Sequence, residues 1–188
     1  MSRWTACPWL FMLRPRFTAT LTGIFMALHI LATGGTFDKQ YDAVNGTLGF
    51  GATHLPQLLQ QARCQIEHRV STVLLKDSLD MDDDDRAALL QQCRAVEEQH
   101  LVVIHGTDTM THTARVLAEA ALAKTIVLTG AMVPATCAGS DAIFNLGAAV
   151  ALAQILEPGV YIAMNGVCFP WHQVRKNRAL GRFESTIA

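Results

Sequence analysis

Two short apolar runs in this chain stop abruptly at clusters of glycine and threonine. Leu28 to Ala32 leads into Thr33-Gly34-Gly35-Thr36, and Leu101 to Ile104 leads into His105-Gly106-Thr107-Asp108-Thr109. An apolar run that ends at small polar residues is typical of a buried parallel strand, which carries those residues to the sheet edge where open α/β folds keep their sites. We therefore expect the two polar strand ends to face one another across a cleft.

The rest of the chain alternates between predicted strands and predicted helices. Further strands are expected at Val70–Leu75, Lys124–Leu128 and Val160–Met164, and helices over 55–62, 83–98, 109–122 and 142–156. This order predicts a single-domain α/β fold of the doubly wound, flavodoxin-like kind, in which a mainly parallel sheet carries helices on both faces. Residues 37–51 hold three glycines within six residues, so we expect a mobile loop that can serve as a lid.

The length of 188 residues suits one domain, which we expect to span residues 26–188 because Met26 leads directly into the first strand. Residues 1–25 mix short apolar patches with three arginines, unlike a secretory signal. They predict an N-terminal extension that the domain does not use, the alternative being an extra helix packed on the sheet. The apolar stretch 17–32 contains Gly23 and His29, which makes it a poor membrane span, so no membrane partner is expected.

Charge and cysteine usage narrow the possible partners. A formal net charge of −1 leaves no basic footprint for nucleic acid. Five cysteines without a C-x-x-C pair favour a reduced, cytoplasmic setting, and seven histidines without an H-x-x-x-H pair argue against a metal site. The run Asp82 to Asp85 lacks the alternation and the glycine of a calcium loop, and it predicts the acidic first turn of a helix.

The polar strand ends do not match the common catalytic or nucleotide-binding motifs. The segment TGGT differs from G-x-G-x-x-G, and the chain has neither a phosphate loop nor a G-x-S-x-G elbow. Threonine remains as a nucleophile, and its weakly acidic hydroxyl needs a nearby base or proton path. The candidates are Thr36 with Tyr41 in the following loop, Thr107 beside Asp108, and Lys176, since a lysine enclosed in a cleft can lose its proton.

The segments ATGGT (32–36) and IHGTDTM (104–110) together resemble the two signatures of the L-asparaginase family of bacterial amidohydrolases. Four further landmarks follow the family's order: Ser78 with Asp80 and Met81, GAMVP at 130–134, Asp141 with FNL at 144–146, and Met164-Asn165 with Lys176 downstream. The resemblance covers roughly 150 residues. It corresponds to the N-terminal catalytic domain of two-domain asparaginases.

The resemblance implies a role for each matching residue. Thr36 would be the nucleophile that attacks the side-chain amide of asparagine or a related small amide, with Tyr41 assisting and with no metal or cofactor. Thr107, Asp108 and Lys176 would form a second triad, in which Asp108 also takes the α-ammonium group of the substrate and Ser78 takes its α-carboxylate. Gly35 and Gly106 would let backbone N–H groups approach the carbonyl oxygen as an oxyanion hole.

Other interpretations of these residues stay open. Thr33 and Thr36 could satisfy backbone groups at a strand end, Asp108 or Thr109 could cap a helix, and Arg175 stands next to Lys176. A pocket formed by this domain alone would either be completed by another copy in a homo-oligomer or be more open. Two other functions remain: a domain that binds an amino acid or amide without turnover, as a sensor or partner module, and a flavodoxin-like nucleotide binder.

Overall fold

The computed structural model describes residues 27–187, and the predicted N-terminal extension, residues 1–25, lies outside them. The elements in chain order are β1 (Leu28–Gly34), η1 (Thr36–Asp38), β2 (Lys39–Asp42), β3 (Thr47–Phe50), α1 (Leu55–Gln61), β4 (His68–Lys76), α2 (Asp83–Ala95), β5 (His100–Ile104), α3 (Met110–Glu119), β6 (Thr125–Thr129), α4 (Ala142–Ala153), β7 (Gly159–Met164), β8 (Val167–Pro170), η2 (Trp171–Gln173), β9 (Val174–Asn177) and β10 (Arg182–Ser185).

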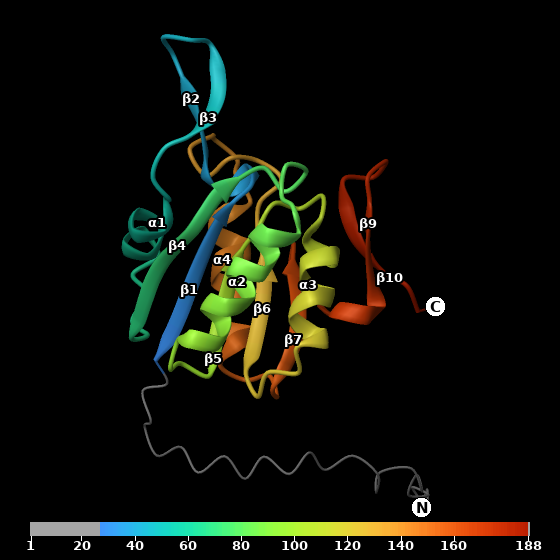
Figure 1. The fold of residues 1–188 in the computed structure, drawn as a ribbon. Helices are drawn as coiled ribbons and strands as arrows, with labels where there is room; N and C mark the ends of the chain where they lie inside the picture. The colour runs from blue at the N-terminus through green and yellow to red at the C-terminus, as the bar shows by residue number, and fades with distance from the viewer. Residues whose placement is uncertain (1–26, 188) are drawn as a thin grey trace, which may run out of the picture.

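A six-stranded sheet with the order β4-β1-β5-β6-β7-β8 runs through the centre of the molecule (Figure 1). Its first five strands are parallel, and only β8 pairs antiparallel, with β7. Numbered along the chain, the parallel strands follow the order 2-1-3-4-5 of flavodoxin-like folds, so the topological switch point lies between β1 and β5. The predicted fold class is confirmed, and the two polar strand ends are neighbours at this switch point.

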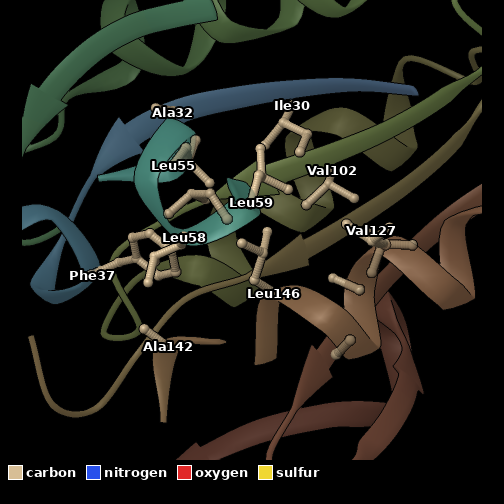
Figure 2. Packing of buried hydrophobic residues seen from close by; sticks show 14 of the residues in the cluster. Ile30, Ala32, Phe37, Leu55, Leu58, Leu59, Val102, Val127, Ala142 and Leu146 are labelled. Carbon is tan, nitrogen blue, oxygen red and sulfur yellow. The ribbon is translucent and has the colours of Figure 1, made fainter. Parts of the chain in front are cut away.

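Alternation along the strands divides the core into two layers. Ile30 and Val102 point to the face covered by α1 and α4, where Figure 2 shows them packed with leucines of both helices. Leu31 and Val103 point to the opposite face, which α2 and α3 cover. Because both faces are buried, each central strand is apolar at successive positions, which is why the sequence showed continuous apolar runs rather than alternation.

Several boundaries differ from the predicted ones for local reasons. The expected mobile loop 37–51 contains the hairpin β2–β3, whose turn is built on the Asp42 carboxylate accepting hydrogen bonds from the backbone N–H groups of Val44 and Asn45. Helix α3 ends at Glu119, before Ala121, which has a left-handed φ of 47°. Helix α2 ends at Ala95 because Val96 is extended.

The acidic run at 82–85 begins α2, as predicted. Asp82 is the N-cap residue and accepts a hydrogen bond from the Asp85 N–H, while the Asp85 carboxylate accepts one from the Asp82 N–H. Lys76 forms an ion pair with Asp85 at 2.7 Å. These bonds form a reciprocal capping box that fixes the start of the helix. None of the helices between residues 27 and 187 is long and apolar enough to cross a membrane.

Candidate active site

The ends of β1 and β5 lie in backbone contact at the switch point. Gly35 has a positive φ of 70°, and a Cβ atom placed on it would lie 2.3 Å from the Gly106 Cα. Only glycine fits at this position, since any side chain would push the two strand ends apart. The nucleophile candidate Thr36 follows directly, half-buried at the first residue of η1.

A partly buried polar triad lies at the β5 end. Lys176, on β9 and 69 residues further along the chain, donates a hydrogen bond from Nζ to Thr107 Oγ1 at 2.7 Å. The same ammonium lies 3.0 Å from Asp108 Oδ1, and the side chains of Lys176 and Asp108 are only 13% and 31% exposed. Thr107, Asp108 and Lys176, which the family resemblance implied as a triad, therefore form one hydrogen-bonded group.

The register of the β9–β10 hairpin determines which of two adjacent cations on β9, Arg175 or Lys176, reaches the triad. Arg175 is exposed and pairs with Glu184 of β10 at 3.5 Å. Lys176 is the neighbour that reaches Thr107. A second cation, Arg178, lies 3.5 Å from Asp108 Oδ1, so the carboxylate is shared by two positive groups.

Ser78 lies directly behind Gly106. A Cβ atom on Gly106 would approach the Ser78 Oγ to 2.6 Å, and Ser78 itself is buried. Thr109 ties this loop to the start of α3, because its hydroxyl donates to the Ser78 carbonyl oxygen at 2.7 Å and its N–H donates to Ser78 Oγ at 3.4 Å. The loop that follows β4 and the loop that follows β5 are thus held together beside the triad.

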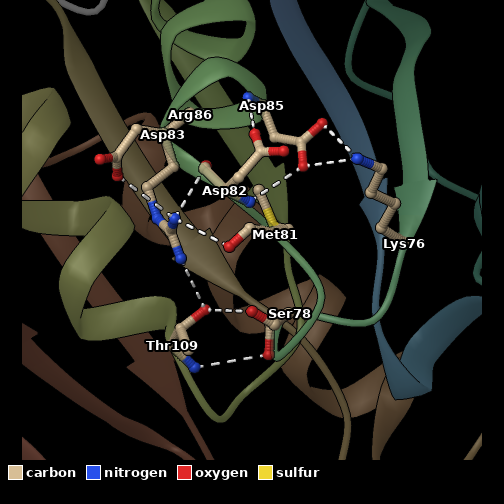
Figure 3. A network of polar contacts seen from close by, with 8 residues as sticks. All are labelled: Lys76, Ser78, Met81, Asp82, Asp83, Asp85, Arg86 and Thr109. Carbon is tan, nitrogen blue, oxygen red and sulfur yellow. Dashed lines mark hydrogen bonds and ion pairs between the residues drawn. The ribbon is translucent and has the colours of Figure 1, made fainter.

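The buried Arg86 was missed by the sequence predictions. Figure 3 shows its guanidinium donating to the carbonyl oxygens of Met81 and Asp82, at 3.0 and 2.8 Å, and to Thr109 Oγ1 at 3.3 Å. Its nearest acidic partner, Asp83, is 3.8 Å away and almost fully exposed. An arginine one turn before Leu89, on the apolar stripe of a helix, was the available signal. Its position joins α2, the Ser78 loop and the start of α3.

His105 is fully buried and fixes the path of the chain between β5 and Thr107. Its Nδ1 lies 2.7 Å from the Gly106 carbonyl oxygen and its Nε2 lies 2.8 Å from the Thr113 hydroxyl. Burial lowers the pKa of His105 to about 4, so the ring is neutral at pH 7. A neutral ring that donates from Nδ1 and accepts at Nε2 satisfies both contacts.

Gly35 and Tyr41 do not join the cluster in the expected way, whereas Gly106 keeps a free N–H in the described chain. The Gly35 N–H donates to the Lys76 carbonyl oxygen at 2.9 Å, so it is occupied rather than directed at a substrate. Gly106 lies outside β5, and within residues 27–187 its N–H makes no hydrogen bond. Tyr41 lies on the projecting β2–β3 hairpin (Figure 1) and is 66% exposed.

The base of this hairpin is nevertheless attached next to the site. Lys39 forms an ion pair with Asp77 at 2.5 Å, and Asp77 immediately precedes Ser78. The hydrogen bond from Lys39, together with the nearby charge of Lys176, lowers the pKa of the Asp77 carboxyl. The structure thus leaves Tyr41 in solvent while it holds the chain between Thr36 and the hairpin close to the Ser78 loop.

Thr33 and Thr109 have structural roles at the ends of a strand and a helix. The Thr33 hydroxyl donates to the Ile104 carbonyl oxygen at 2.8 Å, which satisfies a backbone group between β1 and β5. Thr109 is the N-cap residue of α3, although its side chain makes no capping hydrogen bond. In the part of the chain that the structure describes, no group of three His, Cys, Asp or Glu side chains is placed to hold a metal ion.

Comparison with known proteins agrees with this geometry. The family model "Asparaginase, N-terminal" matches residues 27–185. The chain is 30% identical over 163 residues to an L-asparaginase of Thermococcus kodakarensis, covering 83% of this chain and 49% of that protein. It is 32% identical over 157 residues to L-asparaginase 2 of Escherichia coli, covering 78% of this chain and 45% of that protein.

Solved structures give the same result. The thermostable L-asparaginase from Thermococcus kodakarensis superposes with a TM-score of 0.74 at 30% identity, over 85% of this chain and 51% of that one. A probable cytoplasmic L-asparaginase from Campylobacter jejuni gives a TM-score of 0.72 at 31% identity, over 86% and 53% of the two chains. The chain thus spans about half the length of these relatives. It belongs to the asparaginase family, and residues 27–185 correspond to the family's N-terminal domain.

Proposed function

We propose that this domain is an amidohydrolase that converts L-asparagine, or a related small amide, into the corresponding acid and ammonia. The observation that carries the proposal is the hydrogen-bonded group Thr107, Asp108 and Lys176 at the switch point, beside the backbone contact that leads to Thr36. Relatives at about 31% identity include proteins named L-asparaginase and glutaminase-asparaginase, which supports an amide substrate.

The proposed reaction uses threonine as a covalent nucleophile. Thr36 Oγ attacks the amide carbonyl carbon, its proton passes to the departing nitrogen, and the C–N bond breaks to release ammonia. Water then hydrolyses the threonine ester, which releases the acid and restores the hydroxyl. The Gly106 N–H has no partner in the described chain and is suited to donate to the developing oxyanion.

The triad supplies charge and a proton path on the β5 side of the cleft. Lys176 orients the Thr107 hydroxyl through their 2.7 Å hydrogen bond. The Asp108 carboxylate, which is partly exposed, offers the negative charge that an α-ammonium group of an amino-acid substrate requires. Ser78 lies behind Gly106 on the same side, consistent with a role in placing the α-carboxylate.

The test is ammonia release from L-asparagine, L-glutamine and simple amides by the purified chain. Thr36→Ala and Thr107→Val are expected to abolish release and to keep the wild-type melting temperature within a few degrees. Thr186→Ala is the matched control, since Thr186 is exposed near the C-terminal end of the described chain. Full activity in Thr36→Ala would refute the threonine mechanism.

A second function is favoured by one observation, the 66% exposure of Tyr41 on the hairpin. A site that lacks its tyrosine would bind an amino acid or amide without turnover, as a sensor or partner module. Heat stabilisation by L-aspartate, together with no ammonia release from any amide tested, would establish this function. Under either proposal, a second copy of the chain could complete the site. Ammonia release that rises with the fraction of dimer would support completion by a second copy.

A further inference from the structure

A cationic pocket of about 750 Å³ is lined by residues of α3, η2 and β9, together with Asp108 and Arg178. In Figure 1 the β9–β10 hairpin lies beside α3. Arg115 of α3 lines one wall, and Arg175 and Arg178 line the other. Trp171 and His172 of η2 contribute to the wall, with their rings in edge contact at 5.4 Å between centroids. Asp108 and Lys176 of the triad also line the pocket, so it is continuous with the candidate active site.

The charges of this pocket are not balanced by its own acidic groups. Four lining residues are lysine or arginine and one is aspartate, which leaves three positive charges in excess on a chain whose net charge is −1. Asp108 is shared by Lys176 and Arg178, and Glu184 is shared by Arg175 and Arg182. Arg115 forms no ion pair with any acidic group of residues 27–187. Each guanidinium carries five N–H donors, so most of these donors lack a protein acceptor.

We infer that this pocket binds an anionic group, a carboxylate or a phosphate, on a small molecule. Guanidinium groups from opposite walls match the paired oxygen acceptors of such groups, and charge-assisted bonds of this kind are among the strongest that a protein surface offers. The Trp171 and His172 rings provide an aromatic wall for the body of the ligand. An anion at this place would also lie near Arg178 and thus next to the Asp108 carboxylate.

Two sources of the anion are distinguishable. A free anion would occupy the pocket independently of the reaction. Alternatively, the anion belongs to the substrate, an interpretation that rests on the proposed function. Asp108, which is proposed to hold the α-nitrogen of the substrate, lines the pocket. An acidic residue joined to that nitrogen would still donate an amide N–H to Asp108 and would extend along this wall to the arginines. The substrate class in that case is a peptide or conjugate that carries an acidic group on the α-nitrogen of asparagine.

The binding experiment is calorimetric titration of the full chain with citrate and with inorganic phosphate, at an ionic strength held constant with sodium chloride. We expect saturable binding of at least one probe, weakened about tenfold or more in the double variant Arg115→Ala/Arg175→Ala. The double variant Arg63→Ala/Arg94→Ala removes two exposed arginines elsewhere and is the matched control. Absence of saturable binding, or equal weakening in both double variants, would overturn the inference.

The second arm compares ammonia release from glutamyl-asparagine and leucyl-asparagine. A preference for the acidic dipeptide that disappears in Arg115→Ala/Arg175→Ala assigns the anion to the substrate, whereas citrate or phosphate binding without such a preference assigns it to a free anion. Anion binding in the pocket with no ammonia release from any amide would refute the proposed amidohydrolase function but would still support anion binding by this pocket. If the double variant melts early, Arg115→Gln alone supplies the comparison, because this exposed side chain makes no ion pair within residues 27–187.

Discussion

Replacing Lys176 by methionine separates the chemistry of the triad from the stability of the fold. Methionine keeps an unbranched chain of similar length and removes the ammonium, so the hydrogen bond to Thr107 at 2.7 Å and the ion pair with Asp108 at 3.0 Å are lost. Two charge-assisted bonds of this kind are worth about 1.5 kcal/mol each before solvent screening. Asp108 keeps Arg178 at 3.5 Å, and its side chain is 31% exposed, so no unpaired charge becomes buried.

The expected loss of stability is therefore about 1–2 kcal/mol, which is small against the ~5–15 kcal/mol that holds a typical domain folded. The protein stays folded, and any large loss of activity then reports on chemistry. We expect the rate of ammonia release to fall by about 10²–10⁴, the range for removal of a general base or proton relay.

The assay pairs steady-state ammonia release with urea unfolding. Lys124→Met is the control, because Lys124 is also partly buried and donates to the Val96 carbonyl oxygen, but at the start of β6, the opposite end of the strands from the triad. Both variants should lose similar stability, and only Lys176→Met should lose activity. A Lys176→Met rate within a few-fold of wild type would refute the role of the triad.

Three further predictions concern how the site is held. Arg86→Met removes three hydrogen bonds, to Met81, Asp82 and Thr109, so we expect the free energy of unfolding in urea to fall by about 3 kcal/mol. Arg94 is exposed on the same helix, and the control variant Arg94→Met should change this free energy by less than about 0.5 kcal/mol. Gly35→Ala places a Cβ atom 2.3 Å from the Gly106 Cα at a residue with positive φ, whereas Gly46→Ala, the control, has a similar φ and nothing within 4 Å of the new Cβ. We expect Gly35→Ala to lower the free energy of unfolding by at least about 2 kcal/mol more than Gly46→Ala. Equal losses of stability would contradict the close approach of the strand ends. Burial lowers the pKa of His105 to about 4, so the unfolded chain binds a proton on this residue more readily than the folded chain does. The free energy of unfolding therefore falls as the pH drops from about 6.5 towards 4, by about 1.4 kcal/mol per pH unit at most. Urea unfolding of His105→Gln should lose this pH dependence, and an unchanged pH profile would show that His105 is not its source.

The strand ends were predictable because burial and local chemistry agree there. Parallel strands with both faces covered are apolar throughout, so Leu101 to Ile104 was recognisable and its sudden end at Gly106 and Thr107 placed the site at the sheet edge. The two strand ends meet because β1 and β5 pair at the switch point, a consequence of the strand order rather than of either segment alone.

The features that the sequence did not predict depend on contacts between side chains and backbone groups in the folded chain. The glycines of residues 37–51 suggested a mobile loop, but the Asp42 carboxylate accepts two backbone hydrogen bonds that order the turn of the β2–β3 hairpin. The role of Arg86 requires knowing that Thr109 lies beside the Ser78 loop. The occupied N–H of Gly35 depends on the position of Lys76 at the end of β4. Of these, only Arg86 left a signal in the residue spacing, one turn before Leu89 on the apolar stripe of α2, and its partners could not be inferred from that spacing.

The measurement that tests the central claim most directly is covalent trapping of the acyl intermediate. The chain is mixed with carbon-labelled L-asparagine, or with whichever amide releases ammonia, and quenched in acid within the first turnovers before peptide mapping by mass spectrometry. The label is expected on the peptide that contains Thr36 and is expected to be absent from the Thr36→Ala protein. Label on another residue, or continued ammonia release by Thr36→Ala with no label at all, would contradict the assignment of Thr36 as the nucleophile.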